Sequence, residues 1–304
     1  MKELIKKILL QSTSLETQSK IVQLFLQNLI NKTHHSNQLQ KLLIALEEYQ
    51  IKTEDKFRKV ESQKIKLPER LNFQKTSCLE PFVIQNNAPW LLLNIKQNSI
   101  PGMISHEEKQ YYSYIGQFYS GQGEIIELGP WLGLSTHYII DGLIKNPNFT
   151  SKKIYVFDDF IWRSSWMNKW LSLDEQLENH QDFQFLFNKY SSDLQEYIQV
   201  DKRKIVEFDG NQNVPQLNWD NSLIEFMYID CGRTFEVNQA WYKIYSPYFI
   251  PNVTLLIMQD WRTHREFPPL WYNQTKQFTE SKSEQLQLIH EVSNGCVATF
   301  LYKG

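Results

Sequence analysis

Residues 123–146 read GEIIELGPWLGLSTHYIIDGLIKN and decide the fold prediction. The apolar run at 124–128 is typical of a buried strand, and it leads through two glycines into a helical pattern. Glycines at such a turn allow close backbone approach, while free N–H groups and the helix dipole attract an anionic group. This stretch therefore predicts a strand, a ligand-binding turn and a helix.

The rest of the chain after residue 98 repeats this alternation of short apolar runs and helical stretches. Such alternation indicates βα units and a parallel sheet. The tail differs, because two strand-like runs within 285–302 are separated by Ser-Asn-Gly, which predicts a hairpin. We predict an α/β fold, a doubly wound Rossmann-like seven-stranded sheet with an antiparallel terminal hairpin. Its first five strands are expected at 124–128, 153–158, 203–208, 224–230 and 253–259.

Composition narrows the function classes. The chain has 304 residues with 32 Lys and Arg against 34 Asp and Glu, so its overall charge does not favour nucleic acid or an anionic membrane. Its three cysteines lie far apart and form no CxxC pair, which argues against a disulfide framework and a thiolate zinc site. With neither a signal peptide nor a membrane span expected, we predict a cytoplasmic protein.

The chain is expected to have three parts. Residues 1–66 carry 12 basic against seven acidic side chains, and their apolar residues recur at helical spacing. They predict a helical N-terminal extension that packs on the main domain or forms a homodimer contact. Residues 67–98 are interpreted as a linker, and residues 99–304 as the α/β domain.

Acidic residues stand at the ends of several predicted strands, namely Glu127, Asp158, Asp230 and Asp260. In an open α/β sheet, ligands bind outside the carboxyl ends of the strands, so these side chains are expected at one crevice. The alternative is that each acid merely caps the helix that follows it. The turn GPWLGLST matches neither the dinucleotide fingerprint GxGxxG nor a P-loop.

The turn instead fits ExGxxxGxST, the first motif of many class I S-adenosylmethionine-dependent methyltransferases. Residues 99–262 resemble the small-molecule O-methyltransferases that include macrocin O-methyltransferase and related sugar enzymes. The resemblance begins with SIPGMISHEEKQYYSYIG and continues through EIIELGPWLGLST, IYVFDDF, MYID and IMQD. It implies a class I methyltransferase domain that uses S-adenosylmethionine and a small-molecule acceptor, with no nucleic-acid or membrane partner.

The resemblance also implies roles for individual residues, all in the binding of S-adenosylmethionine. Those expected at its methionine end are Glu127, Gly129, Gly133, Ser135 and Thr136. Those expected around its ribose and adenine are Asp158, Asp159, Phe160, Asp209 and Gly210. Met103 would approach the cofactor from the preceding segment, and Asp230 completes the set.

The chain departs from the family after the fourth strand. Relatives often carry a histidine there, whereas this chain reads Asp230-Cys-Gly-Arg233. We therefore name His264 as the candidate general base, Asp260 as its partner or substitute, and Arg233 as a clamp for an anionic acceptor. A divalent metal, if bound, would use Asp230 and Asp260. Trp261 stands where relatives have a second acid, which argues against such a metal.

The leading hypothesis is an S-adenosylmethionine-dependent methyltransferase that modifies a hydroxyl or carboxylate of a specialised metabolite or sugar. A second hypothesis keeps the fold and uses Asp230 and Asp260 to hold a metal for other chemistry, since a fold does not determine a reaction. A third is a non-catalytic protein that acts through its N-terminal helices.

Overall fold

The computed structural model describes residues 88–266 and 273–304. The predicted helical extension at 1–66 and most of the predicted linker lie outside these residues. The described residues 88–264 and 273–304 belong to one compact unit. Within the part of the chain that is described, no helix has the length and apolarity needed to cross a membrane.

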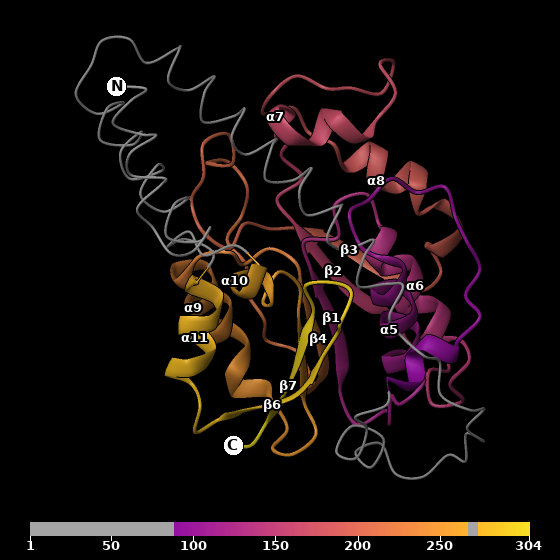
Figure 1. Ribbon diagram of the computed structural model, residues 1–304. Coiled ribbons are helices and arrows are strands. Elements are labelled where there is room, and N and C mark those ends of the chain that lie inside the picture. The colour runs from indigo at the N-terminus through magenta and orange to yellow at the C-terminus, as the bar shows by residue number, and fades with distance from the viewer. Residues whose placement is uncertain (1–87, 267–272) are drawn as a thin grey trace, which may run out of the picture. The chain divides into compact units, whose positions relative to one another are not determined.

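A seven-stranded sheet forms the centre of this unit (Figure 1). The first five strands run parallel in the order β3-β2-β1-β4-β5, and β7 and β6 complete the sheet as an antiparallel pair. The strands are β1 (Glu124–Leu128), β2 (Ile154–Asp158), β3 (Ile198–Lys202), β4 (Ile224–Ile229), β5 (Leu255–Met258), β6 (Leu286–Glu291) and β7 (Ala298–Tyr302). This confirms the doubly wound fold with its antiparallel hairpin.

The predicted third strand is wrong in position. We expected it at 203–208, whereas β3 occupies Ile198–Lys202. β3 pairs with β2 along its full length, and its register places the buried Ile198 beside Ile154. After Lys202 the chain leaves the sheet, and Lys204 forms an isolated bridge with Gln216. The apolar side chains at 205–206 pack against the core from outside the sheet, so a strand-like pattern arose without a strand.

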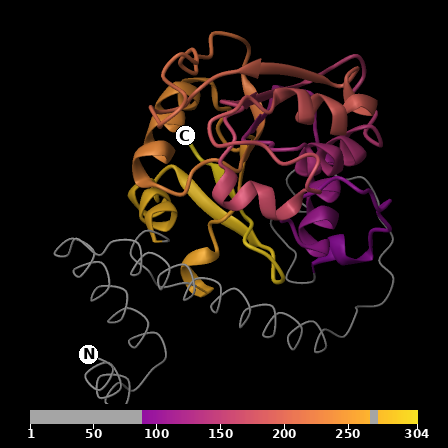
Figure 2. The same ribbon diagram turned by 90° about the horizontal axis from the view of Figure 1, so that it is seen from above.

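Two helical layers cover the sheet, as Figures 1 and 2 show. On one face lie α5 (His106–Gly116), α6 (Leu134–Leu143) and α8 (Gln184–Tyr190), and on the other lie α9 (Phe235–Tyr245) and α11 (Gln274–Ser281). The short elements are η1 (Pro89–Leu92), α7 (Ser164–Met167), η2 (Asn168–Trp170), η3 (Ser192–Leu194), η4 (Ser246–Tyr248) and α10 (Thr263–Glu266).

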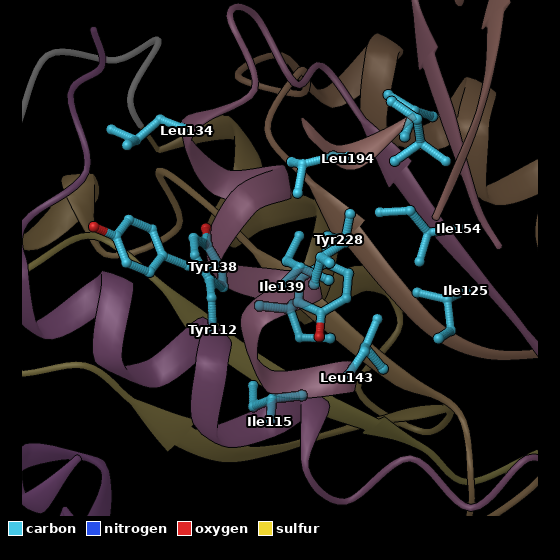
Figure 3. Packing of buried hydrophobic residues seen from close by; sticks show 14 of the residues in the cluster. Tyr112, Ile115, Ile125, Leu134, Tyr138, Ile139, Leu143, Ile154, Leu194 and Tyr228 are labelled. Carbon is cyan, nitrogen blue, oxygen red and sulfur yellow. The ribbon is translucent and has the colours of Figure 1, made fainter. Parts of the chain in front are cut away.

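Alternation along β1 produces the two layers of the core. Ile125 belongs to the cluster beneath α5 and α6, and Ile126 belongs to the cluster beneath α9 and α11. Both side chains are fully buried because successive residues of a strand point to opposite faces. Figure 3 shows the first cluster, to which Ile115 of α5, Ile139 of α6, Ile125 of β1 and Ile154 of β2 all belong.

Helices α5 and α6 cross closely enough to require glycine. A Cβ atom added to Gly142 would lie 2.1 Å from the carbonyl oxygen of Ser113, and one added to Gly116 would lie 2.8 Å from the backbone nitrogen of Leu143. Neither contact involves the flexible end of a side chain, so the backbones themselves would have to separate. This crossing fixes the position of α6 over the sheet.

We expect Gly142→Ala to lower the free energy of unfolding by about 2 kcal/mol, because overpacking outweighs the gain in helix propensity. Urea unfolding followed by circular dichroism measures the change. Ile144→Ala at the exposed end of α6 is the control and should have a much smaller effect. A Gly142→Ala variant as stable as the wild type would contradict the close crossing.

Candidate functional site

The carboxyl edge of the sheet contains most of the predicted site residues. This edge is formed by the last residues of β1, β2, β4 and β5 and by the residues that directly follow them. Strand order reverses here, because β2 and β4 flank β1 on opposite sides. Ligands of doubly wound sheets bind at such a switch point. Several residues in left-handed backbone conformations also lie along this edge, namely Gly129, Trp131, Gly133, Phe160 and Asp260. Such conformations in non-glycine residues often accompany functional sites.

The turn between β1 and α6 needs its first glycine for a structural reason. Gly129 has a φ of 79°, and a Cβ atom there would lie 2.6 Å from the carbonyl oxygen of Asp230. Its N–H group donates to the carbonyl of Phe157 at 2.9 Å. The glycine therefore lets β1 end in contact with the end of β2 and with the residue that follows β4.

The second glycine of this turn begins α6. Gly133 has a φ of 89°, occupies the N-cap position, and has no side chain that could cap the helix. The first turn of α6 contains no acidic side chain either. The backbone N–H groups of a helix start and its dipole favour an anionic group, so this end can receive a carboxylate or phosphate.

Glu127 links the end of β1 to the first turn of α6. One carboxylate oxygen accepts a hydrogen bond from the Ser135 hydroxyl and the other accepts one from the Thr136 hydroxyl, each at 2.6 Å. All three side chains are buried. Burial raises the pKa of Glu127 to about 7, although the two hydroxyl groups oppose this shift. These predicted cofactor residues thus bind one another and shape the turn.

Asp158 ends β2 and is half-buried. Its carboxylate accepts a hydrogen bond from the backbone N–H of Phe160 at 2.7 Å. Burial raises the pKa of Asp158 to about 7, and the neighbouring charge of Asp159 adds to this effect. The side chain of Phe160 is fully buried among Phe183 and Phe187, so it supports the turn from the core.

Asp159 is held by two residues that the sequence analysis missed. Arg163 donates to both carboxylate oxygens, at 3.2 and 2.7 Å, and Asn211 donates to one of them at 2.9 Å. Burial alone would raise the pKa of Asp159, but these donors and the Arg163 charge lower it. The i, i+4 spacing of Asp159 and Arg163 was the available signal. Asn211 had no such signal, because it lies 52 residues away in sequence.

The predicted Asp209-Gly210 pair precedes Asn211 in the same turn. Asp209 is 87% exposed and lies beside His180, with 3.3 Å between Nε2 and Oδ2. Gly210 has a φ of 92°, and a Cβ atom there would lie 2.8 Å from the His180 ring. The turn therefore reaches Asp159 through Asn211, while Asp209 points to solvent.

The ends of β4 and β5 bring together three predicted residues. The Nε atom of Arg233 donates to Oδ2 of Asp260 at 2.6 Å, and Asp260 has a φ of 60°. Asp230 directly follows β4 and is exposed. Desolvation by the surrounding protein and the nearby Asp260 raise the pKa of Asp230, while Arg233 opposes the shift. In residues 88–266 and 273–304, no three metal-ligating side chains cluster.

The remaining predicted residues are His264 and Met103. His264 lies in α10, and its Nδ1 atom donates to the carbonyl of Trp261 at 2.6 Å, so in the neutral ring Nε2 is the acceptor nitrogen. Its ring stacks edge-on against Trp261, with 4.6 Å between centroids. Met103 is 45% exposed, and the adjacent Gly102 packs against Leu134 at the start of α6.

No protein-family model and no curated protein matches the sequence. Several solved structures have a similar fold. PaMTH1, a methyltransferase of Podospora anserina solved with S-adenosylhomocysteine, is 11% identical over 66% of this chain and 80% of its own, with a TM-score of 0.43. An S-adenosylmethionine-dependent O-methyltransferase of Thermotoga maritima is 9% identical over 71% and 70%, with a TM-score of 0.40. CalS11, a TDP-rhamnose 3'-O-methyltransferase of calicheamicin biosynthesis, is 12% identical over 60% of this chain and 73% of its own, with a TM-score of 0.37. At these identities the likeness concerns the fold alone.

The buried Glu127 carboxylate should make stability depend on pH. Its pKa is higher in the folded state than the ordinary value of 4.5, so its contribution is fully present below about pH 4.5 and is lost as the pH rises through about 7. Glu127→Gln should not show this loss. From pH 5 to pH 8, we expect the free energy of unfolding of the wild type to fall by about 2 kcal/mol relative to that of Glu127→Gln.

Urea unfolding at the two pH values measures this change. Glu124→Gln at the other end of β1 is the control, because that side chain is partly exposed. If Glu127→Gln and the wild type change in parallel between pH 5 and pH 8, the carboxyl group does not titrate in this range.

Proposed function

We propose that this protein is an S-adenosylmethionine-dependent methyltransferase that methylates a hydroxyl or carboxylate of a small molecule. The observation that carries the proposal is the charge pattern at the carboxyl edge. Arg163 balances Asp159 and Arg233 balances Asp260, which leaves Asp158 and Asp230 as the remaining acids there. Next to them stands the start of α6, which favours an anion.

This pattern suits a ligand that carries both charges. A cationic sulfonium or ammonium group is favoured beside carboxylates, and a carboxylate is favoured at the N-terminus of α6. The ribose hydroxyls of the same ligand can donate to Asp158. S-adenosylmethionine has all four groups. The pyrophosphate of a dinucleotide would instead bring two negative charges close to Asp158 and Asp230.

The residues have distinct tasks in this proposal. When bound, the cofactor would supply an electrophilic methyl group. The turn from Gly129 to Gly133 receives the methionine end through backbone N–H groups, and Glu127, Ser135 and Thr136 hold that turn in shape. Asp158 binds the ribose, and the Arg163–Asp159–Asn211 group fixes the backbone beside it. Such positioning supplies much of the rate of a group transfer.

The acceptor is proposed to bind near the ends of β4 and β5. A hydroxyl acceptor must lose a proton, and we assign this to Nε2 of His264, with Asp260 as its partner or substitute. Arg233 holds Asp260 and can attract an anionic group of the acceptor. Because Arg233 already brings a cation to Asp260, we propose transfer without a divalent metal. A cytoplasmic location and a homodimer formed through residues 1–66 complete the proposal.

The first test is isothermal titration with S-adenosylmethionine, S-adenosylhomocysteine and, as control, NAD. We expect micromolar binding of the first two and none of NAD, with no change after chelator treatment. Asp158→Asn should weaken binding of both by about tenfold or more, since a carboxylate loses part of its hydrogen bonding to the ribose.

Asp182→Asn is the matched control, because Asp182 is 55% exposed and pairs with Lys202. It should bind like the wild type. Binding that is unaffected by Asp158→Asn would refute the assigned ribose contact, and a lack of binding of both methionine derivatives would refute the proposed function.

A further inference from the structure

Two adjacent glutamates at the start of α5 are buried. Glu107 accepts hydrogen bonds from the indole N–H of Trp90 at 2.9 Å and from the backbone N–H groups of Ser293 at 3.2 Å and Asn294 at 2.7 Å. The last two belong to the turn between β6 and β7. Glu107 therefore attaches this turn to α5.

Glu108 attaches the same turn and, in addition, the end of β5. Its Oε1 atom accepts from the backbone N–H of Cys296 at 2.7 Å and from Nε2 of Gln259 at 3.0 Å, and its Oε2 atom accepts from the N–H of Ser105 at 2.5 Å. Burial raises the pKa of Glu108, but all of these partners are donors and match the ionised form. In the described part of the chain, Gln259 bonds to Glu108 and not to Glu107.

Gln259 is held at both ends of its side-chain amide. Its Oε1 atom accepts from the hydroxyl of Tyr112 at 2.6 Å, and its Nε2 atom donates to Glu108. Its backbone N–H donates to the carbonyl of Ile229 at 2.9 Å. Two residues of α5, one turn apart, thus fix this amide in a single orientation.

The residue after Gln259 is Asp260, whose left-handed backbone is disfavoured for a side chain with a Cβ atom. Such a conformation persists where its surroundings determine it. On the amino side of Asp260, the fixed Gln259 holds the backbone. On the carboxyl side, the N–H group of Thr263 donates a 3.2 Å hydrogen bond to the Asp260 carbonyl. With its backbone held in this way, Asp260 meets Nε of Arg233.

We infer that Gln259 is a positioning residue that connects the buried Glu108 and Tyr112 of α5 to the Arg233–Asp260 ion pair. The inference rests on the proposed function in one respect, because only that proposal assigns the ion pair to acceptor binding. The geometric part, that α5 determines the ion pair through one amide, does not depend on any ligand.

The test observes the ion pair directly in the full-length protein. The Nε–H signal of Arg233 in a ¹H–¹⁵N NMR spectrum, identified by its loss in Arg233→Lys, reports the bond to Asp260. We expect Glu108→Gln and the milder Tyr112→Phe each to shift this signal and to speed its hydrogen exchange by about tenfold.

Glu107→Gln is the matched control. It removes an equally buried neighbouring charge that holds the same turn, but it does not touch Gln259. The Arg233 signal should stay in place in this variant. The inference is overturned if the signal is unmoved in both Glu108→Gln and Tyr112→Phe, or if Glu107→Gln moves it equally.

Gln259→Glu provides a further test. It places two carboxylates face to face and should move the Arg233 signal. A signal that stays in its wild-type position would count against the inference. Because no ligand is needed, a failure to bind S-adenosylmethionine would refute the proposed function and leave this result standing.

Discussion

The rest of the structure depends on how β1 continues into α6. Glu127 receives the hydroxyl groups of Ser135 and Thr136 in the core, so the strand and the helix cannot separate without leaving a buried carboxylate unsatisfied. The glycine turn between them is short, and Gly142 locks the far side of α6 against α5. The position of the helix N-terminus at the carboxyl edge follows from these contacts.

Charge compensation divides this edge into two kinds of acid. Asp159 and Asp260 have guanidinium partners and serve as fixed points for the local backbone. Asp158 and Asp230 have raised pKa values, because desolvation and a neighbouring carboxylate outweigh the nearby arginine. In the proposed function, a cation or a hydroxyl donor of the ligand would offset these two carboxylates.

The sequence predicted the central strands and missed the outer one for a physical reason. β1 is a central strand whose residues from Ile125 to Leu128 are all buried, whereas β3 is an edge strand with a partly exposed pattern. The acids at the strand ends were found by their position. The partner Asn211 was not found, because it reaches Asp159 through a turn whose course depends on long-range packing. Arg233 was named as a clamp for the acceptor, but its bond to Asp260 was not predicted.

The contact between α5 and the β6–β7 turn joins parts of the chain that lie far apart in sequence. Glu108 and Cys296 are 188 residues apart, yet their hydrogen bond is buried. Closing a loop of this length has a large entropic penalty and slows folding. During synthesis, α5 leaves the ribosome long before its carboxylates can meet their donors. The domain therefore completes its core only after its last two strands have emerged.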